Sequence, residues 1–243
     1  MSLASSEWRI GSAQRVGGRS GQEDRLSVRR RPDGRLLLAV ADGAGGHDDG
    51  EKASATAIAC LERAFVEAPA DGSGNWLAEA LAAADRAVAA LGQGPTAPRT
   101  TIVAAAIDAG GKAQVGHVGD SRLYLFRDGG IAFRTRDHSI VQLLLDMGRL
   151  EEGDIASHPD RSRLLKALGG GDQWADLASL ALEPGDGLAL CSDGVWEHIE
   201  ARQLWDALDS PELERAAEAV VAQAVERGGR SADNASLVLA RWR

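Results

Sequence analysis

One segment of the sequence reads Leu36-Leu-Leu-Ala-Val-Ala-Asp-Gly-Ala-Gly-Gly-His47, an apolar run that ends in an aspartate and a glycine-rich turn. Six consecutive apolar residues next to turn residues are typical of a buried strand. Asp42 would then stand at the end of a rigid element and point out of it. The glycines that follow carry no side chain, so backbone or a ligand can come close. The alternative interpretation is an ordinary Asp-Gly hairpin turn.

The same pattern occurs twice more along the chain, and a fourth aspartate adjoins another apolar run. Ala113-Gln-Val-Gly-His-Val-Gly-Asp120 and Gly187-Leu-Ala-Leu-Cys-Ser-Asp193 are apolar runs that end in aspartate, and Asp233 comes just before the closing run 235–242. We therefore predict that four aspartates converge at one end of a sheet. Converging carboxylates raise each other's pKa unless a cation lies among them. Oxygen ligands alone favour magnesium or manganese over zinc.

Length and composition indicate one globular unit. The 243 residues are enough for one well-buried domain, and 44% apolar content argues against disorder. We see no repeat or linker, and predict a single domain over residues 1–243. The formal net charge of -9 and the sequence pI of about 5.1 disfavour binding to nucleic acid or to an anionic membrane through bulk charge.

The cysteines and the N-terminus bear on location. Cys60 and Cys191 lie in apolar runs and look like small core residues, a usage that fits a reducing cytosol. The first residues have no basic-then-apolar signal pattern, and no apolar run approaches membrane-spanning length. We expect a cytoplasmic protein that is not embedded in a membrane.

Hydrophobic periodicity predicts an α+β domain. Strands and helix pairs do not alternate as βαβ units, so a parallel doubly wound sheet is disfavoured. We predict two antiparallel sheets packed face to face, with helix pairs outside. Strands are expected at 25–28, 36–41, 100–108, 113–118, 123–127, 131–135, 177–182, 187–191 and 235–242, and helices at 48–68, 76–91, 195–208 and 211–227.

Three local features refine this prediction. The strands 100–108, 113–118 and 123–127 follow one another with short turns, which is typical of a meander. Asp137 is expected to cap the start of a helix that runs to Asp146. A short helical piece is expected at 163–168.

The ordered set of motifs resembles the metal-dependent serine/threonine protein phosphatases of the PPM (PP2C) type, in their compact bacterial form. The resemblance extends from about Arg15 to Trp242 and rests on eight pieces in order. They are Arg19-Ser-Gly-Gln-Glu-Asp24, Ala41-Asp-Gly-Ala-Gly-Gly-His47, Thr100-Thr-Ile, Gly116-His-Val-Gly-Asp-Ser-Arg122, Thr135-Arg-Asp-His-Ser139, His158-Pro, Cys191-Ser-Asp-Gly194 and Asp233-Asn234.

This resemblance implies a central β-sandwich flanked by helices in four layers, α-β-β-α. It also implies roles for single residues. Asp42 matches the aspartate that bridges two catalytic Mn²⁺ or Mg²⁺ ions, and the backbone carbonyl of Gly43 matches a ligand of the first ion. Asp193 and Asp233 match ligands of the second ion, and Asp120 matches the acid that, with Asp193, holds a third ion in bacterial members.

Further positions match groups around the metals. Glu23 and Asp24 match acids that support metal-bound waters, and Arg19 matches the arginine that binds the substrate phosphate. Eukaryotic members have a histidine, proposed as general acid, where Ala44 stands here, so a metal-bound water is the simplest proton donor. The segment 147–171, with Arg149, Arg161, Arg163 and Lys166, matches the family's flap beside the active site.

The resemblance implies an enzyme that hydrolyses phosphoserine and phosphothreonine on proteins by a water activated between two metal ions. A monomer that acts on phosphoproteins and opposes a bacterial serine/threonine kinase is the leading hypothesis. Two alternatives are a non-catalytic pseudophosphatase that binds phosphoproteins and a narrow phosphatase of an anti-sigma-antagonist. Loss of a metal aspartate would favour the pseudophosphatase, and none is lost.

Overall fold

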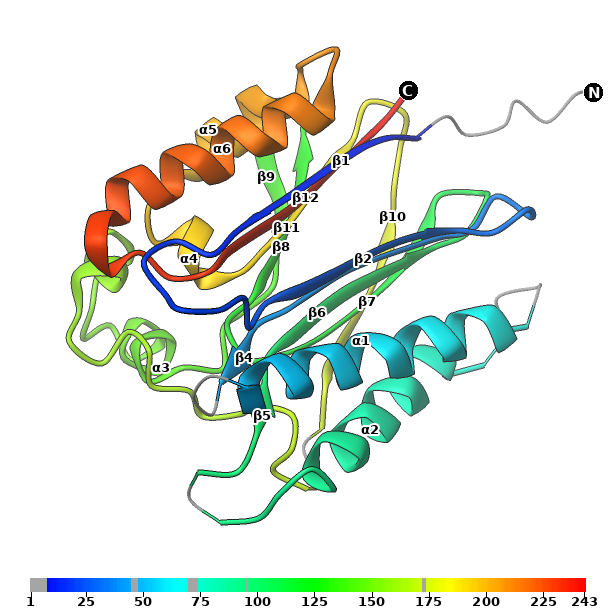
Figure 1. Ribbon diagram of the computed structural model, residues 1–243. Coiled ribbons are helices and arrows are strands. Elements are labelled where there is room, and N and C mark those ends of the chain that lie inside the picture. The colour runs from blue at the N-terminus through cyan, green and yellow to red at the C-terminus, as the bar shows by residue number, and fades with distance from the viewer. Residues whose placement is uncertain (1–7, 45–47, 70–73, 95, 172–173) are drawn as a thin grey trace, which may run out of the picture.

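The computed structural model describes residues 8–44, 48–69, 74–94, 96–171 and 174–243. Two sheets pack face to face, and helices cover the outer face of each (Figure 1). This α-β-β-α arrangement confirms the predicted fold class. The residues Gly45, Gly46 and His47 of the glycine-rich motif lie outside the described residues.

The first sheet contains the organising strand. Its order is β10-β7-β6-β3-β2, and every pairing in it is antiparallel. Its strands are β2 (Arg25–Arg30), β3 (Leu36–Ala41), β6 (Ile102–Ile107), β7 (Lys112–Val118) and β10 (Asp176–Ala181).

The strand β3 is apolar throughout because both of its faces are buried. Leu37 and Ala39 contact the helix layer, whereas Leu36, Leu38 and Val40 lie in the core between the sheets. A strand that is buried on both sides reads as a continuous apolar run rather than as an alternation.

The second sheet has the order β1-β12-β11-β8-β9 and is also antiparallel. Its edge strand β1 was missed in the sequence, because it lies in a stretch, residues 7–31, that as a whole is polar and rich in glycine. It is a strand because all eight of its residues pair with β12 in an antiparallel ladder. The strands are β1 (Trp8–Arg15), β8 (Arg122–Arg127), β9 (Gly130–Arg134), β11 (Gly187–Cys191) and β12 (Ala235–Trp242).

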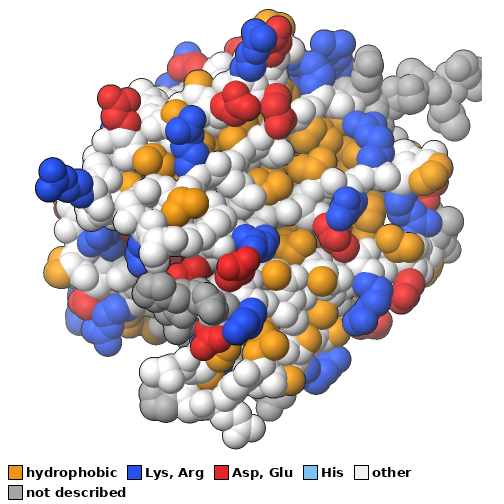
Figure 2. Space-filling model, viewed as in Figure 1, with side chains coloured by type: hydrophobic (Ala, Val, Ile, Leu, Met, Phe, Trp, Pro, Cys, Tyr) orange, Lys and Arg blue, Asp and Glu red, His pale blue; other side chains and the backbone are white. Residues whose placement is uncertain are grey.

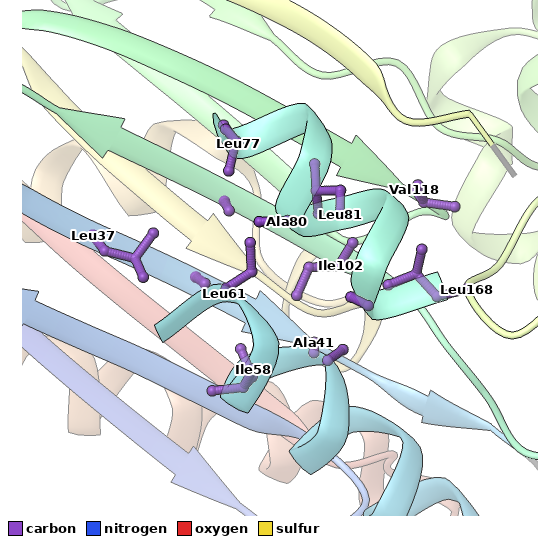
Figure 3. Packing of buried hydrophobic residues seen from close by; sticks show 14 of the residues in the cluster. Leu37, Ala41, Ile58, Leu61, Leu77, Ala80, Leu81, Ile102, Val118 and Leu168 are labelled. Atoms are coloured by element: carbon purple, nitrogen blue, oxygen red, sulfur yellow. The ribbon is translucent and has the colours of Figure 1, made fainter. Parts of the chain in front are cut away.

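The helices cover the two outer faces. α1 (Asp48–Glu67) and α2 (Trp76–Ala89) lie on the first sheet, and Figure 3 shows Leu61 of α1 and Leu81 of α2 among the residues packed there. On the second sheet lie α5 (Ala201–Leu208) and α6 (Leu213–Gly228) (Figure 1). The predicted helix 195–208 is in fact two helices, α4 (Asp193–Trp196) and α5.

The predicted meander was wrong at its third strand. β6 and β7 pair in the first sheet, but β8 belongs to the second, so the chain crosses between sheets at residues 119–121. Gly119 makes this crossing with a φ of +104°, and a Cβ there would lie 2.6 Å from Thr101. A side chain at this position would meet both backbone strain and a steric clash.

Two local predictions were also wrong. Ser139 caps α3 (Ile140–Asp146) by accepting a hydrogen bond from the Gln142 N–H, whereas Asp137 is buried against Arg122. The segment 163–168 is not helical, since Leu164 and Leu168 form isolated β-bridges to Ser139 and Thr100. The 147–171 flap instead contains a 3₁₀ turn, Glu152–Ser157.

Smaller elements complete the chain. β4 (Gly43–Ala44) pairs with β5 (Arg99–Thr100), and a second 3₁₀ turn covers Gly229–Ser231. Acidic and basic side chains are interspersed over the face shown in Figure 2. Within the described ranges, no helix is long and apolar enough to cross a membrane.

Candidate active site

A pocket of about 250 Å³ gathers the sequence-predicted residues. All four aspartates line it, together with Arg19, Glu23 and Gly43; of the predicted site residues, only Asp24 does not. The complete lining is Arg19, Glu23, Asp42, Gly43, Ala44, Thr101, Asp120, Ser162, Leu164, Asp193, Asp233 and Asn234.

Asp42 is held by Thr100, the last residue of β5, and by Thr101, which follows it. Its backbone N–H donates to Thr101 Oγ1 at 3.1 Å, and its carbonyl accepts from the Thr101 N–H at 2.8 Å and from Thr100 Oγ1 at 2.9 Å. The next residue must be small, because a Cβ on Gly43 would lie 2.1 Å from the Gly50 carbonyl oxygen. The strand end and its hydrogen bonds thus fix where the Asp42 carboxylate stands.

The other pocket acids come from three further chain segments. Asp120 lies in the crossing between β7 and β8, and Asp193 begins α4 directly after β11. Asp233 comes just before β12, and its Oδ2 accepts a hydrogen bond from Arg19 Nη2 at 2.6 Å. Four segments that are far apart in the sequence therefore supply the carboxylates.

Asn234 organises the N-terminal loop, a role that the sequence interpretation missed. Its Oδ1 accepts from the Glu23 N–H at 2.6 Å, and its Nδ2 donates to the carbonyls of Val16 and Gly21 at 2.7 and 3.0 Å. In the sequence, the feature that could have pointed to this role is the position of Asn234 directly after the predicted metal ligand Asp233. These bonds hold Arg19 and Glu23 near the mouth of the pocket.

Asp24 is fully buried beneath the pocket. Its Oδ2 accepts hydrogen bonds from the hydroxyls of Ser192 at 2.8 Å and Ser236 at 2.6 Å. Its Oδ1 has no hydrogen-bond partner among the described residues. Burial raises the pKa of Asp24 to about 7, although the two serine hydrogen bonds act to lower it. The charges of Asp193 and Asp233 add to the rise.

Asp193, Asp42 and Asp120 also have raised pKa values. Burial raises the pKa of Asp193 to about 7, and the charges of Asp233 and Glu197 add to it. The pKa of Asp42 is raised well above its usual range by burial and by the charges of Asp24 and Asp193. The pKa of Asp120 is likewise raised by burial and by Asp193. A cluster of this kind is costly to ionise without a cation.

The donor set fits a hard divalent ion. The pocket offers carboxylate and carbonyl oxygens, which suit magnesium and manganese. The buried Asp193 Oδ1 finds no hydrogen-bond partner in the described part of the chain, so it has an unused lone pair. A cation at this position would satisfy that oxygen and lower the raised pKa values.

A second group of metal-ligand types lies outside this pocket. His117, His138 and Asp176 present ligand atoms within 4.8 Å of one another. However, His138 Nδ1 accepts a hydrogen bond from the Gly119 N–H, and in a neutral imidazole this places the proton on Nε2, facing Asp176 at 3.3 Å. Burial lowers the pKa of His138 and favours that neutral form. A nitrogen that carries a proton cannot bind a metal, so the hydrogen bond from the Gly119 N–H to His138 Nδ1 disfavours an ion here.

The flap reaches the pocket through uncharged residues. Ser162 and Leu164 line it, whereas none of the four flap cations does, and three of them form ion pairs. Arg161 pairs with Glu197 at 3.1 Å, Arg163 with Asp160 at 3.0 Å and Lys166 with Asp176 at 3.1 Å. The arrangement places a hydroxyl and an apolar side chain, rather than a cation, at the flap side of the pocket.

Comparison with known proteins shows which family has this fold and this pocket. A model of the protein phosphatase 2C family matches residues 10–227. The chain belongs to the protein phosphatase 2C family. The match takes in every residue of the pocket except Asp233 and Asn234, which lie C-terminal to it.

Two relatives and one solved structure agree with this membership. The serine/threonine protein phosphatase PstP of Mycobacterium tuberculosis is 36% identical over 218 residues, 85% of this chain and 40% of that protein. The chain thus spans about two fifths of the length of this relative. The serine/threonine phosphatase stp of Listeria welshimeri is 31% identical over 230 residues, 91% of this chain and 90% of that protein.

The third comparison is structural. The crystal structure of the catalytic domain of PstP in complex with two manganese ions superposes with a TM-score of 0.82. The two share 31% identity, and the superposition covers 97% of this chain and 98% of that one. The four-layer sandwich is therefore the fold of the family.

Proposed function

We propose that this chain hydrolyses phosphate esters of serine and threonine on proteins in a reaction that requires divalent metal ions. The observation that carries the proposal is the gathering of seven of the eight predicted site residues in one pocket. The family membership and the manganese-bound relative support it.

The pocket acids would hold the metals. Asp42 would bridge two ions of Mn²⁺ or Mg²⁺, the Gly43 carbonyl would bind the first, and Asp193 and Asp233 the second. Asp120 would hold a third ion together with Asp193. Bound ions would supply an activated water and neutralise negative charge on the phosphate.

The groups around the acids would bind substrate and support the site. The Arg19 side chain is 55% exposed at the pocket mouth, and its planar guanidinium suits two phosphate oxygens. Glu23 lines the pocket and would hydrogen-bond to metal-bound waters. Asp24 does not line the pocket, so we assign it the indirect role of holding Ser192 and Ser236 beneath the acids.

The wider setting follows from the same proposal. We propose that residues 1–243 form one phosphatase domain that works as a monomer and opposes a serine/threonine kinase. Of the described residues, Cys60 and Cys191 are free thiols, which supports a reducing cytoplasmic setting.

A phosphothreonine peptide assay tests the function. The wild type should release phosphate with manganese present, and Asp42→Asn should reduce turnover to background. Asp206→Asn is a matched control, because Asp206 pairs with Arg202 on the exposed face of α5 and does not line the pocket. A wild type that binds manganese but leaves the peptide phosphorylated would contradict the proposal.

A further inference from the structure

Resting on the proposed function, we infer that Trp196 is a positioning residue that fixes Asp120 relative to Asp193 and thereby sets the affinity for the cation that these two acids hold. Trp196 and Asp193 lie at opposite ends of the four-residue helix α4. The indole therefore moves with Asp193, and its contact with Asp120 couples the two acids.

The coupling contact is a buried hydrogen bond. Trp196 Nε1–H donates to the Asp120 backbone carbonyl at 2.9 Å. Trp196 is 7% exposed and Asp120 is 4% exposed, so water cannot readily replace the donor. Removing the N–H would leave a buried carbonyl without this partner, which is more costly than losing an exposed hydrogen bond.

Asp120 needs such a contact because it lies outside both sheets. β7 ends at Val118 and β8 begins at Arg122, so no strand ladder holds the residues between them. Ser121 is tied to the residue that directly precedes β6, since its hydroxyl is 2.7 Å from Thr101 Oγ1. The indole supplies a tie on the α4 side. His138 also holds Gly119 through two hydrogen bonds, at 2.9 and 3.1 Å, but the Trp196 bond is the one that acts on the Asp120 carbonyl itself.

The indole is itself held in place by Arg122. The guanidinium carbon of Arg122 lies 3.6 Å from the centre of the Trp196 ring, a cation–π contact. Asp137 fixes the guanidinium through hydrogen bonds of 3.0 Å from Nε and 2.7 Å from Nη2, and Nη1 donates to Tyr124 at 3.2 Å. Arg122 and Asp137 are both buried. This pair orients the ring whose N–H meets Asp120.

A metal ligand has to be held close to its productive geometry for tight binding. Loss of a group that orients a ligand typically weakens metal affinity by about 10- to 100-fold. For one hydrogen bond to a backbone carbonyl we expect the lower end, a loss of roughly 10-fold. The ions that Asp42 and Asp233 hold without Asp120 should be affected much less.

The test is a calorimetric Mn²⁺ titration of the metal-free protein. Trp196→Phe removes the N–H and keeps a ring beneath Arg122. It should weaken the binding of one Mn²⁺ ion by roughly 10-fold and raise the Mn²⁺ concentration needed for half-maximal activity. At saturating Mn²⁺ its kcat should return to near the wild-type value.

A matched control separates this effect from general damage. Trp205 also lies against an arginine, with the Arg241 guanidinium carbon 4.5 Å from the ring centre, but within the described part of the chain its indole N–H donates to no pocket residue, whereas that of Trp196 donates to Asp120. Trp205→Phe should leave the Mn²⁺ titration unchanged. If Trp196→Phe does not fold, a benzothienylalanine at position 196 keeps the ring size and replaces only the N–H by sulfur.

The outcomes are distinct. An unchanged Mn²⁺ titration in a folded variant lacking the N–H overturns the role of Trp196, as does an equal effect of Trp205→Phe. A wild type that binds no Mn²⁺ overturns the proposed function itself. Weaker Mn²⁺ binding with recoverable kcat, seen only at position 196, supports the inference.

Discussion

Replacing Asp24 by asparagine should stabilise the metal-free protein, and the gain should grow with pH. Asp24 is fully buried, with Oδ2 bonded to Ser192 and Ser236 and Oδ1 without a partner among the described residues. An asparagine can keep the two serine hydrogen bonds through its oxygen. Its NH₂ group would then replace the oxygen that carries uncompensated negative charge.

The magnitude follows from the pKa of Asp24, which rises from 3.8 to about 7 in the native protein, chiefly through burial. The native state then binds more protons than the unfolded state, so stability falls as pH rises from about 4 to about 7. At ~1.4 kcal/mol per pKa unit, the penalty is about 1.5 kcal/mol at pH 5 and about 4 kcal/mol at pH 7.5. Asp24→Asn removes this penalty. The gain in the free energy of unfolding over the wild type should therefore be about 2.5 kcal/mol larger at pH 7.5 than at pH 5.

Thermal unfolding in EDTA at pH 5 and pH 7.5 measures this difference. For a chain of this size, about 2.5 kcal/mol corresponds to a Tm difference of roughly 5–10 °C. Asp206→Asn, an exposed acid on α5, should show no such pH-dependent gain. A Tm gain of the same size at both pH values, or a loss at pH 7.5, would refute the reasoning.

Three further predictions concern activity. EDTA should abolish hydrolysis of p-nitrophenyl phosphate and added Mn²⁺ or Mg²⁺ should restore it, whereas full activity after exhaustive chelation would contradict a metal-dependent reaction. Asp42→Asn and Asp193→Asn should each abolish turnover and weaken Mn²⁺ binding in calorimetry with the fold intact, because removing a charge relieves repulsion among the acids; unchanged binding and rate would remove these residues from the site. Arg19→Ala should lower kcat/KM on a phosphothreonine peptide by roughly 10- to 100-fold at unchanged metal affinity, with partial rescue by Arg19→Lys, since an ammonium lacks the planar fork. If Arg19→Ala retained the wild-type kcat/KM, the phosphate would have to be bound elsewhere.

The sequence alone was sufficient to predict those helices and strands that have a periodic apolar pattern or are bounded by turn residues. The β3 run, the turn before it and the helices α1 and α2 were predicted to within a few residues. Asp42 and Asp193 could be singled out because each ends an apolar run, and strand ends are where a sheet presents side chains to a pocket. The antiparallel α+β class followed from the order of strands and helix pairs.

Contacts between distant segments decided the rest. β1 has no alternating pattern, and it is a strand because β12, more than 200 residues later, pairs with it. Asp137 looked like a helix cap, but a buried arginine needs a partner, and Arg122 takes it. The crossing at residues 119–121 looks like any short turn in the sequence, since nothing local says which sheet the next strand will join. Trp196 could not be connected to Asp120 for the same reason: a hydrogen bond across 76 residues depends on how the sheets pack.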